Sequence, residues 1–208
     1  MSLYVLIERG ARVVSPLFTG PVMEFFQPAF PLPGSASPAP HLALFLSPVD
    51  AALCKKYMNT RPRQGEDNRY EMALHDAPDV MNAMNYVMSQ GARLCLILGF
   101  STDTAGRLVI RDGCYSLSSW TLTQADLVCL QGLGKKSAHH VLDKAYAVLA
   151  EHGADGYEED IQRLDLEGPP AIHKMAELAL AQIGAVKNVQ DGGFSIFSPS
   201  QARWRKLV

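Results

Sequence analysis

The spacing of hydrophobic and polar positions changes along the chain, and the change falls near residue 122. Before this point the apolar residues come in short runs. The strongest run covers residues 93–100 and is typical of a strand covered on both faces. After this point apolar residues recur every three or four positions, which predicts helices. The pattern therefore predicts an α+β fold.

In this fold a mixed, mainly antiparallel sheet with two helices occupies residues 1–122, and a helical part occupies residues 123–208. A length of 208 residues is compatible with one continuous domain or with two small ones. Residues 19–40 contain six prolines, which remove amide donors, so we expect a loop without regular structure there. The predicted strands comprise residues 3–7, 12–18, 41–46, 70–74, 93–100, 107–110 and 114–122.

Helix boundaries are marked by capping residues and glycines. Ser47 and Pro48 predict a helix start, because serine accepts an amide hydrogen bond and proline loses nothing at the first helical position. Thr123 and Asp126 approximate a capping box at the start of the second part. Of the other predicted helices, one ends at residue 90 and two cover residues 157–164 and 171–183. A final helix ends at residues 203–206.

One segment carries a pattern associated with a particular chemistry. Leu127 and Leu130 precede the turn Gly132-Leu133-Gly134, and Ala138 follows it at helical spacing. Residues 127–142 thereby resemble the helix-hairpin-helix motif of DNA repair and processing proteins. The resemblance implies that the glycines let backbone amides approach a DNA phosphate, with charge added by Lys135 and Lys136. The alternative is a plain αα-hairpin that uses its glycines to turn and to pack.

A second resemblance lies upstream. Phe45-Leu46-Ser47-Pro48 leads from a predicted strand into a helix, and a second helix and a buried strand follow up to residue 100. Residues 41–100 are in this respect similar to the N-terminal domain of SseB-type secretion-associated proteins. That resemblance implies a role in protein interaction rather than in catalysis.

Composition narrows the classes of protein further. The net charge of −2 lacks the basic excess of a dedicated nucleic-acid binder. Cys54, Cys95, Cys114 and Cys129 form no C-x-x-C pair, which favours buried, reduced thiols in a cytoplasmic protein. The sequence shows neither a signal peptide nor an apolar run long enough to span a membrane.

The residues that could carry catalysis or bind a metal do not form a known pattern. His139 and His140 are adjacent and diverge on a helix, and no serine lies in a G-x-S-x-G context. Acidic residues 155–160 lack the spacing of a calcium loop and predict a solvated helix face. We therefore expect no catalytic residue, no metal and no cofactor.

These observations lead to three hypotheses about function. The first is a non-enzymatic interaction or accessory protein associated with bacterial secretion or virulence, bound to a protein partner through unknown residues. The second is a DNA-associated protein that binds phosphates through residues 132–136. The third is an enzyme, which would be recognised by polar groups with shifted pKa values that converge in one concave site. The sequence leaves the oligomeric state open.

Overall fold

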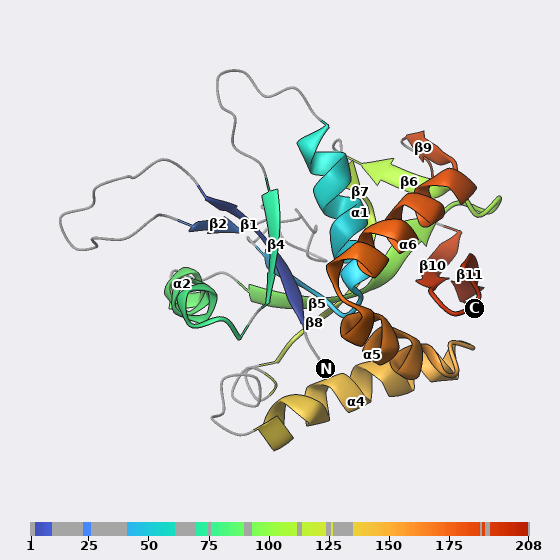
Figure 1. Ribbon diagram of the computed structural model, residues 1–208. Helices are drawn as coiled ribbons and strands as arrows, with labels where there is room; N and C mark the ends of the chain where they lie inside the picture. Colours follow the sequence, from blue (N-terminus) through green and yellow to red (C-terminus); the bar gives the residue numbers. More distant parts are fainter. Residues whose placement is uncertain are drawn as a thin grey trace.

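The computed structural model describes residues 3–9, 23–25, 41–60, 70–74, 76–89, 93–111, 114–123, 126, 135–187, 189 and 192–207 (Figure 1). The strands are β1 (Tyr4–Arg9), β2 (Met23–Phe25), β3 (His41–Phe45), β4 (Tyr70–Leu74), β5 (Arg93–Thr102), β6 (Leu108–Arg111), β7 (Cys114–Tyr115), β8 (Leu117–Thr121), β9 (Ala185–Lys187), β10 (Gly193–Ser198) and β11 (Arg203–Leu207). The helices are α1 (Pro48–Asn59), α2 (Pro78–Ser89), α4 (Lys135–Glu151), α5 (Tyr157–Glu167) and α6 (Pro169–Gln182). The predicted α+β class is confirmed.

Strand β5 organises the sheet because it pairs along both edges. One edge pairs with β3 through residues 93–97 and with β10 through residues 100–102. The other edge pairs with β8 through residues 95–100 and with β6 at Thr102. The β3–β5 and β6–β9 pairs are parallel and the other described pairs are antiparallel, so the sheet is mixed and mainly antiparallel.

Helices cover both faces of the sheet, and side chains of successive strand residues enter opposite cores. In β3, Leu42 and Leu44 enter one core, while Ala43 and Phe45 enter the other. The first core contains residues of α2 and α4 and is called the α2–α4 layer below. The second contains residues of α1 and α6 and is called the α1–α6 layer. Burial on both faces explains the nearly unbroken apolar run of β5.

The capping signals predicted from the sequence are confirmed. Ser47 caps α1, and its hydroxyl accepts a hydrogen bond from the Asp50 amide at 3.3 Å. Thr123 and Asp126 form the reciprocal bonds of a capping box. The Asp126 carboxylate accepts from the Thr123 amide at 2.9 Å, and the Asp126 amide donates to the Thr123 hydroxyl at 3.3 Å. Hydrogen bonds from Thr123 contribute most to holding the pKa of Asp126 below its usual value.

The end of the described chain differs from the prediction. Residues 203–206 were expected in a helix, but they form strand β11, which pairs with β10 from Ser198↔Arg203 to Phe194↔Leu207. A turn connects the two strands, with the Ala202 amide bonded to the Pro199 carbonyl at 3.2 Å. So short a segment forms no stable helix alone, and the edge of β10 offers it a full set of backbone partners.

The expected loop of residues 19–40 also needs correction, because Met23–Phe25 forms strand β2 against β1. The segment between the prolines at 21 and 28 is free of proline, so its amides can donate to a neighbouring strand. The predicted partner strand at residues 12–18 lies outside the described residues. Cys54 and Cys95 are buried free thiols, as expected, whereas the Cys114 side chain and Cys129 lie outside the described part of the chain.

Candidate functional site

Helix α5 begins and ends at positions that the sequence marks clearly. Gly156, with φ of 74°, precedes it, and Gly168, with φ of 82°, follows it. Glycine adopts these left-handed angles without steric strain. Glu158, Glu159 and Asp160 occupy the first turn, where negative charge complements the helix dipole. The acids at this end therefore have a structural reason to be there.

One side of α5 is anchored in both core layers. Tyr157 and Ile161 pack in the α2–α4 layer, whereas Leu164 packs in the α1–α6 layer. A hydrogen bond of 2.6 Å from the Tyr4 hydroxyl in β1 to Asp165 adds a polar link to the sheet. These contacts fix the inner side of the helix on the two cores. On its outer side, Gln162, Leu166 and Glu167 are exposed.

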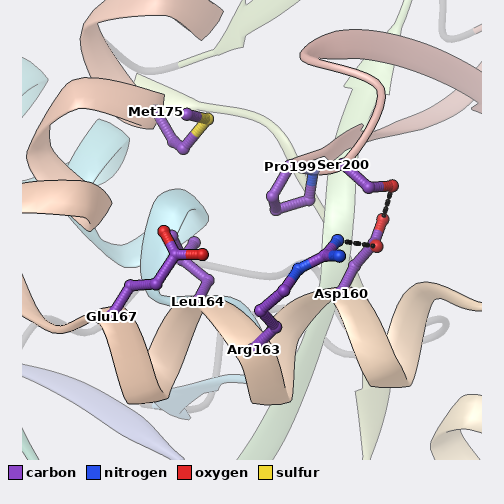
Figure 2. A pocket seen from close by; sticks show the side chains of 7 residues that line it. All are labelled: Asp160, Arg163, Leu164, Glu167, Met175, Pro199 and Ser200. Atoms are coloured by element: carbon purple, nitrogen blue, oxygen red, sulfur yellow. Dashed lines mark hydrogen bonds and ion pairs between the residues drawn. The ribbon is translucent and has the colours of Figure 1, made fainter.

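A pocket of about 300 Å³, called the α5–α6 pocket, opens beside the second half of this helix. Figure 2 shows the Glu167 side chain on one side of the pocket and the Asp160 and Arg163 side chains on the other. Apolar side chains of α5, α6 and the β10–β11 turn form much of the wall between them. The pocket is lined by Asp160, Arg163, Leu164, Glu167, Met175, Pro199 and Ser200.

Asp160 fixes one wall of the α5–α6 pocket. Its carboxylate accepts hydrogen bonds from Ser198 at 3.0 Å and from Ser200, and it pairs with Arg163 at 3.0 Å. These contacts connect α5 to the turn after β10. Because both serines donate directly to a carboxylate, with no histidine in these contacts, the arrangement suits structural support rather than activation of a nucleophile.

A second pocket of about 420 Å³ lies on the other side of α5, against α4. It is lined by Asp143, Tyr146, Ala147, Ala150, Ala154, Asp155, Gly156, Tyr157, Glu158 and Glu159. Four of these ten residues are acidic and none is basic. A pocket therefore lies on each side of α5, and α5 contributes residues to both.

Negative charge is concentrated around α4 and α5. Residues 140–167 contain eight acidic and two basic residues, a net charge of −6, while the whole chain has −2. The rest of the chain therefore carries +4. The negative charge of the chain is thus concentrated in the sequence of these two helices and their connection.

Leu166 is the most exposed large hydrophobic side chain among the described residues. It is 89% exposed on α5, whereas Leu74 in β4 is 43% exposed. A single exposed leucine is common on protein surfaces. Leu166 is followed by Glu167 and lies one helical turn after Arg163, and both of these neighbours line the α5–α6 pocket.

Beneath α5 lies a group of buried polar side chains from three helices. Asp50 of α1 and Tyr157 of α5 are each 1% exposed, and Tyr146 of α4 is 6% exposed. Within the described part of the chain, the Asp50 Oδ1 atom and both tyrosine hydroxyls have no hydrogen-bond partner. Unpaired buried polar atoms are costly, typically by about 1–3 kcal/mol each, so this cluster is under electrostatic strain.

Burial changes the proton affinity of these groups. It raises the pKa of Asp50 to about 8. Burial also raises the pKa of Tyr157 well above its usual value, and the charge of Asp50 adds to the rise. The Ser47 hydroxyl is near enough to offset part of that rise, although the pair does not have the geometry of a hydrogen bond. Asp50 lies in the interior, whereas Tyr146 and Tyr157 also line the pocket between α4 and α5.

The residues of the helix-hairpin-helix hypothesis are not placed in a site by the structure. Gly132, Leu133 and Gly134 lie outside the described residues. Lys135 and Lys136 are the first two residues of α4, and their side chains are also outside the description. Further along α4, His140 and Asp143 are exposed.

Sequence reasoning identified 155–160 as an acidic helix face, but not the α5–α6 pocket. This pocket joins residues of α5 with Met175 of α6 and Ser200 of the β10–β11 turn. No spacing in the sequence relates these three segments. The one available signal was Glu167, an acid at the end of a helix, where the dipole disfavours negative charge.

Comparisons with known proteins give no family. Family models, curated proteins and solved structures all lack a match to this chain. Among the described residues, no group of three or more histidine, cysteine, aspartate or glutamate side chains is placed to hold a metal ion. No helix in the described ranges has the length and apolar character needed to cross a membrane.

Proposed function

We propose that this protein is a non-enzymatic interaction protein that binds a partner protein over the outer side of α5. The observation that carries the proposal is the combination of the exposed Leu166 with the concentration of acids on the same helix. Apolar contact provides affinity, while complementary charge steers the partner and fixes its orientation. The firm anchoring of α5 in both core layers gives this surface a preformed shape.

The proposal includes an association with bacterial secretion or virulence. Its support is the resemblance of residues 41–100 to the SseB N-terminal domain, and this segment contains β3, α1, α2 and β5. The additional strand β4 lies between the two helices.

Site-specific photo-crosslinking tests the proposal. A photoreactive phenylalanine analogue replaces Leu166 in the full chain, which is then expressed in its native host and irradiated. We expect one dominant crosslinked partner protein. A purified sample of that partner should bind the wild-type chain, and Leu166→Asp should weaken this binding roughly tenfold or more. Because Leu166 is exposed, the substitution should leave the stability of the fold within about 0.5 kcal/mol.

Leu74→Asp is the matched control, since it introduces the same change at the other exposed leucine, on β4. It should leave partner binding unchanged. Equal loss of binding in both variants would contradict the proposal. The DNA-associated hypothesis would instead be favoured by two results together. No protein is crosslinked, and the chain binds duplex DNA in a salt-dependent manner that the double substitution Lys135→Glu and Lys136→Glu abolishes.

A further inference from the structure

The α5–α6 pocket contains one acid whose charge is not compensated within the described part of the chain. Asp160 is bonded to Ser198, Ser200 and Arg163, so its charge is already balanced. The Arg163 guanidinium is in turn committed to Asp160. Glu167 makes no hydrogen bond or ion pair with any described residue. A ligand that enters the pocket therefore meets a free carboxylate at one side.

The position of Glu167 in α5 makes this free carboxylate notable. It is the last residue of the helix, and no basic residue occupies the last turn. Negative charge at a helix C-terminus opposes the helix dipole. The other acid of this turn, Asp165, accepts the hydrogen bond from Tyr4 and so has a structural role. No comparable contact with a described residue explains Glu167.

The remaining wall of the pocket is apolar. Leu164 is buried, and Met175 and Pro199 are partly buried around it. Figure 2 shows Leu164 beside Glu167, Met175 above Glu167 and Pro199 above Arg163. An aliphatic chain can pack against this wall while a positive group at its end meets Glu167. The volume of about 300 Å³ is at the lower end for ligand pockets and suits a single long side chain.

We infer that the α5–α6 pocket binds a basic side chain, lysine or arginine, presented by the partner protein. This inference rests on the proposed function and specifies the chemistry of the partner at one point of the α5 surface. The stem of the side chain packs on Leu164, Met175 and Pro199, and its cation pairs with Glu167. An anionic ligand is disfavoured, because Arg163, the only basic side chain among the described residues of the lining, is already paired with Asp160.

Methyl NMR of the full chain with labelled methionine tests the inference, because Met175 reports directly on the pocket. The probes are the N-acetyl, N-methylamide derivatives of lysine, arginine and norleucine. Norleucine has the aliphatic stem without the charge. We expect the lysine and arginine probes to shift the Met175 signal with a Kd on the order of millimolar. The norleucine probe should bind at least roughly fivefold more weakly.

Glu167→Gln should reduce binding of the lysine probe roughly fivefold and leave binding of norleucine unchanged. Glu159→Gln, which removes an exposed acid from the first turn of the same helix, is the control and should have no effect. Equal binding of lysine and norleucine, or no Met175 shift up to about 20 mM of the lysine probe, would overturn the inference.

The outcome is separable from that of the proposed function. If the crosslinked partner depends on Leu166 but no basic probe shifts Met175, the interaction proposal stands and the pocket assignment is wrong. If basic probes bind in a manner that depends on Glu167 while no partner is crosslinked at position 166, the pocket binds basic groups and the docking proposal is wrong.

Discussion

Asp50 combines two roles that oppose each other. Its amide donates to the Ser47 hydroxyl, which supports the start of α1. Asp50 is 1% exposed, and burial of its carboxyl group is what raises its pKa. Burial alone therefore favours the neutral, protonated form. A carboxyl group in this state makes the stability of the fold depend on pH.

The sign of this dependence follows from proton binding. Between about pH 4 and pH 8 the folded protein keeps a proton on Asp50 that the unfolded chain has lost, because the pKa is about 8 when folded and 3.8 otherwise. Rising pH thus favours unfolding. Titration of Asp50 lowers the free energy of unfolding by up to about 1.4 kcal/mol per pH unit in this window, and the decrease levels off above about pH 8.

Asp50→Asn removes the titrating group while keeping its shape. We expect the free energy of unfolding of the variant, relative to wild type, to increase as pH rises from about 5 to about 7.5. Urea unfolding at several pH values measures this difference. A constant difference for Asp50→Asn would show that its carboxyl group titrates normally.

At the scale of elements, β5 and β10 approach each other closely at Gly99. A Cβ atom at this position would lie 2.6 Å from the Ser195 carbonyl oxygen and 3.1 Å from a methyl group of Ile196. The register of β5 against β8 also shifts beside this glycine, between Ile97 and Gly99. The absence of a side chain therefore lets β10 pair with the second half of β5.

Gly99→Ala should push β10 away from β5. We expect a loss of roughly 1–3 kcal/mol in the free energy of unfolding, since the clash involves backbone and cannot be relieved by a rotamer change. Chemical denaturation of the purified variant measures it. Gly184→Ala is the control, because the nearest atoms to its added Cβ belong to the Arg107 side chain at 3.8 Å, and its effect should stay within about 0.5 kcal/mol. Similar stability of both variants would show that β10 is free to shift.

The sequence was informative wherever structure depends on local chemistry. Ser47 with Pro48, and Thr123 with Asp126, fix helix starts through atoms only a few residues apart. The apolar run of β5 and the helical spacing of α4 were equally clear. Strand β11 could not be predicted, because Arg203–Leu207 is a strand only by virtue of the edge that β10 offers.

The candidate site depends even more on distant segments. The acids of α5 were recognisable, but a pocket appears only when α6 and the β10–β11 turn pack beside them. The unpaired polar cluster beneath α5 has the same origin, since Asp50 and Tyr157 are more than a hundred residues apart in the chain. Their residue types predict nothing until tertiary packing brings them together.

At the scale of the whole molecule, residues before and after position 122 share one sheet. Ile196 and Phe197 of β10 are fully buried, one in each core layer. Helices α4 and α6 cover opposite faces of strands that come from the first part of the chain. The two sequence regions thus complete each other's cores.

We therefore predict that residues 1–122 and residues 123–208 do not fold as separate fragments. Each fragment alone should show poorly dispersed amide signals and no cooperative unfolding transition, because large apolar surfaces lose their cover. Coexpression of the two fragments should restore the dispersion of the intact chain. A cooperative transition in the isolated fragment 1–122 would contradict this prediction and indicate an independent domain.

The pairing of β5 with both β3 and β10 also affects how the chain folds while the ribosome is still synthesising it. The ribosome completes β5 at residue 102 and reaches β10 only at residue 193, an interval of 91 residues. At about 5–20 residues per second this interval lasts roughly 5–20 s. During that time the second half of the most apolar strand has one edge without its partner. The nascent chain is thus most in need of protection by chaperones between the appearance of β5 and the arrival of β10.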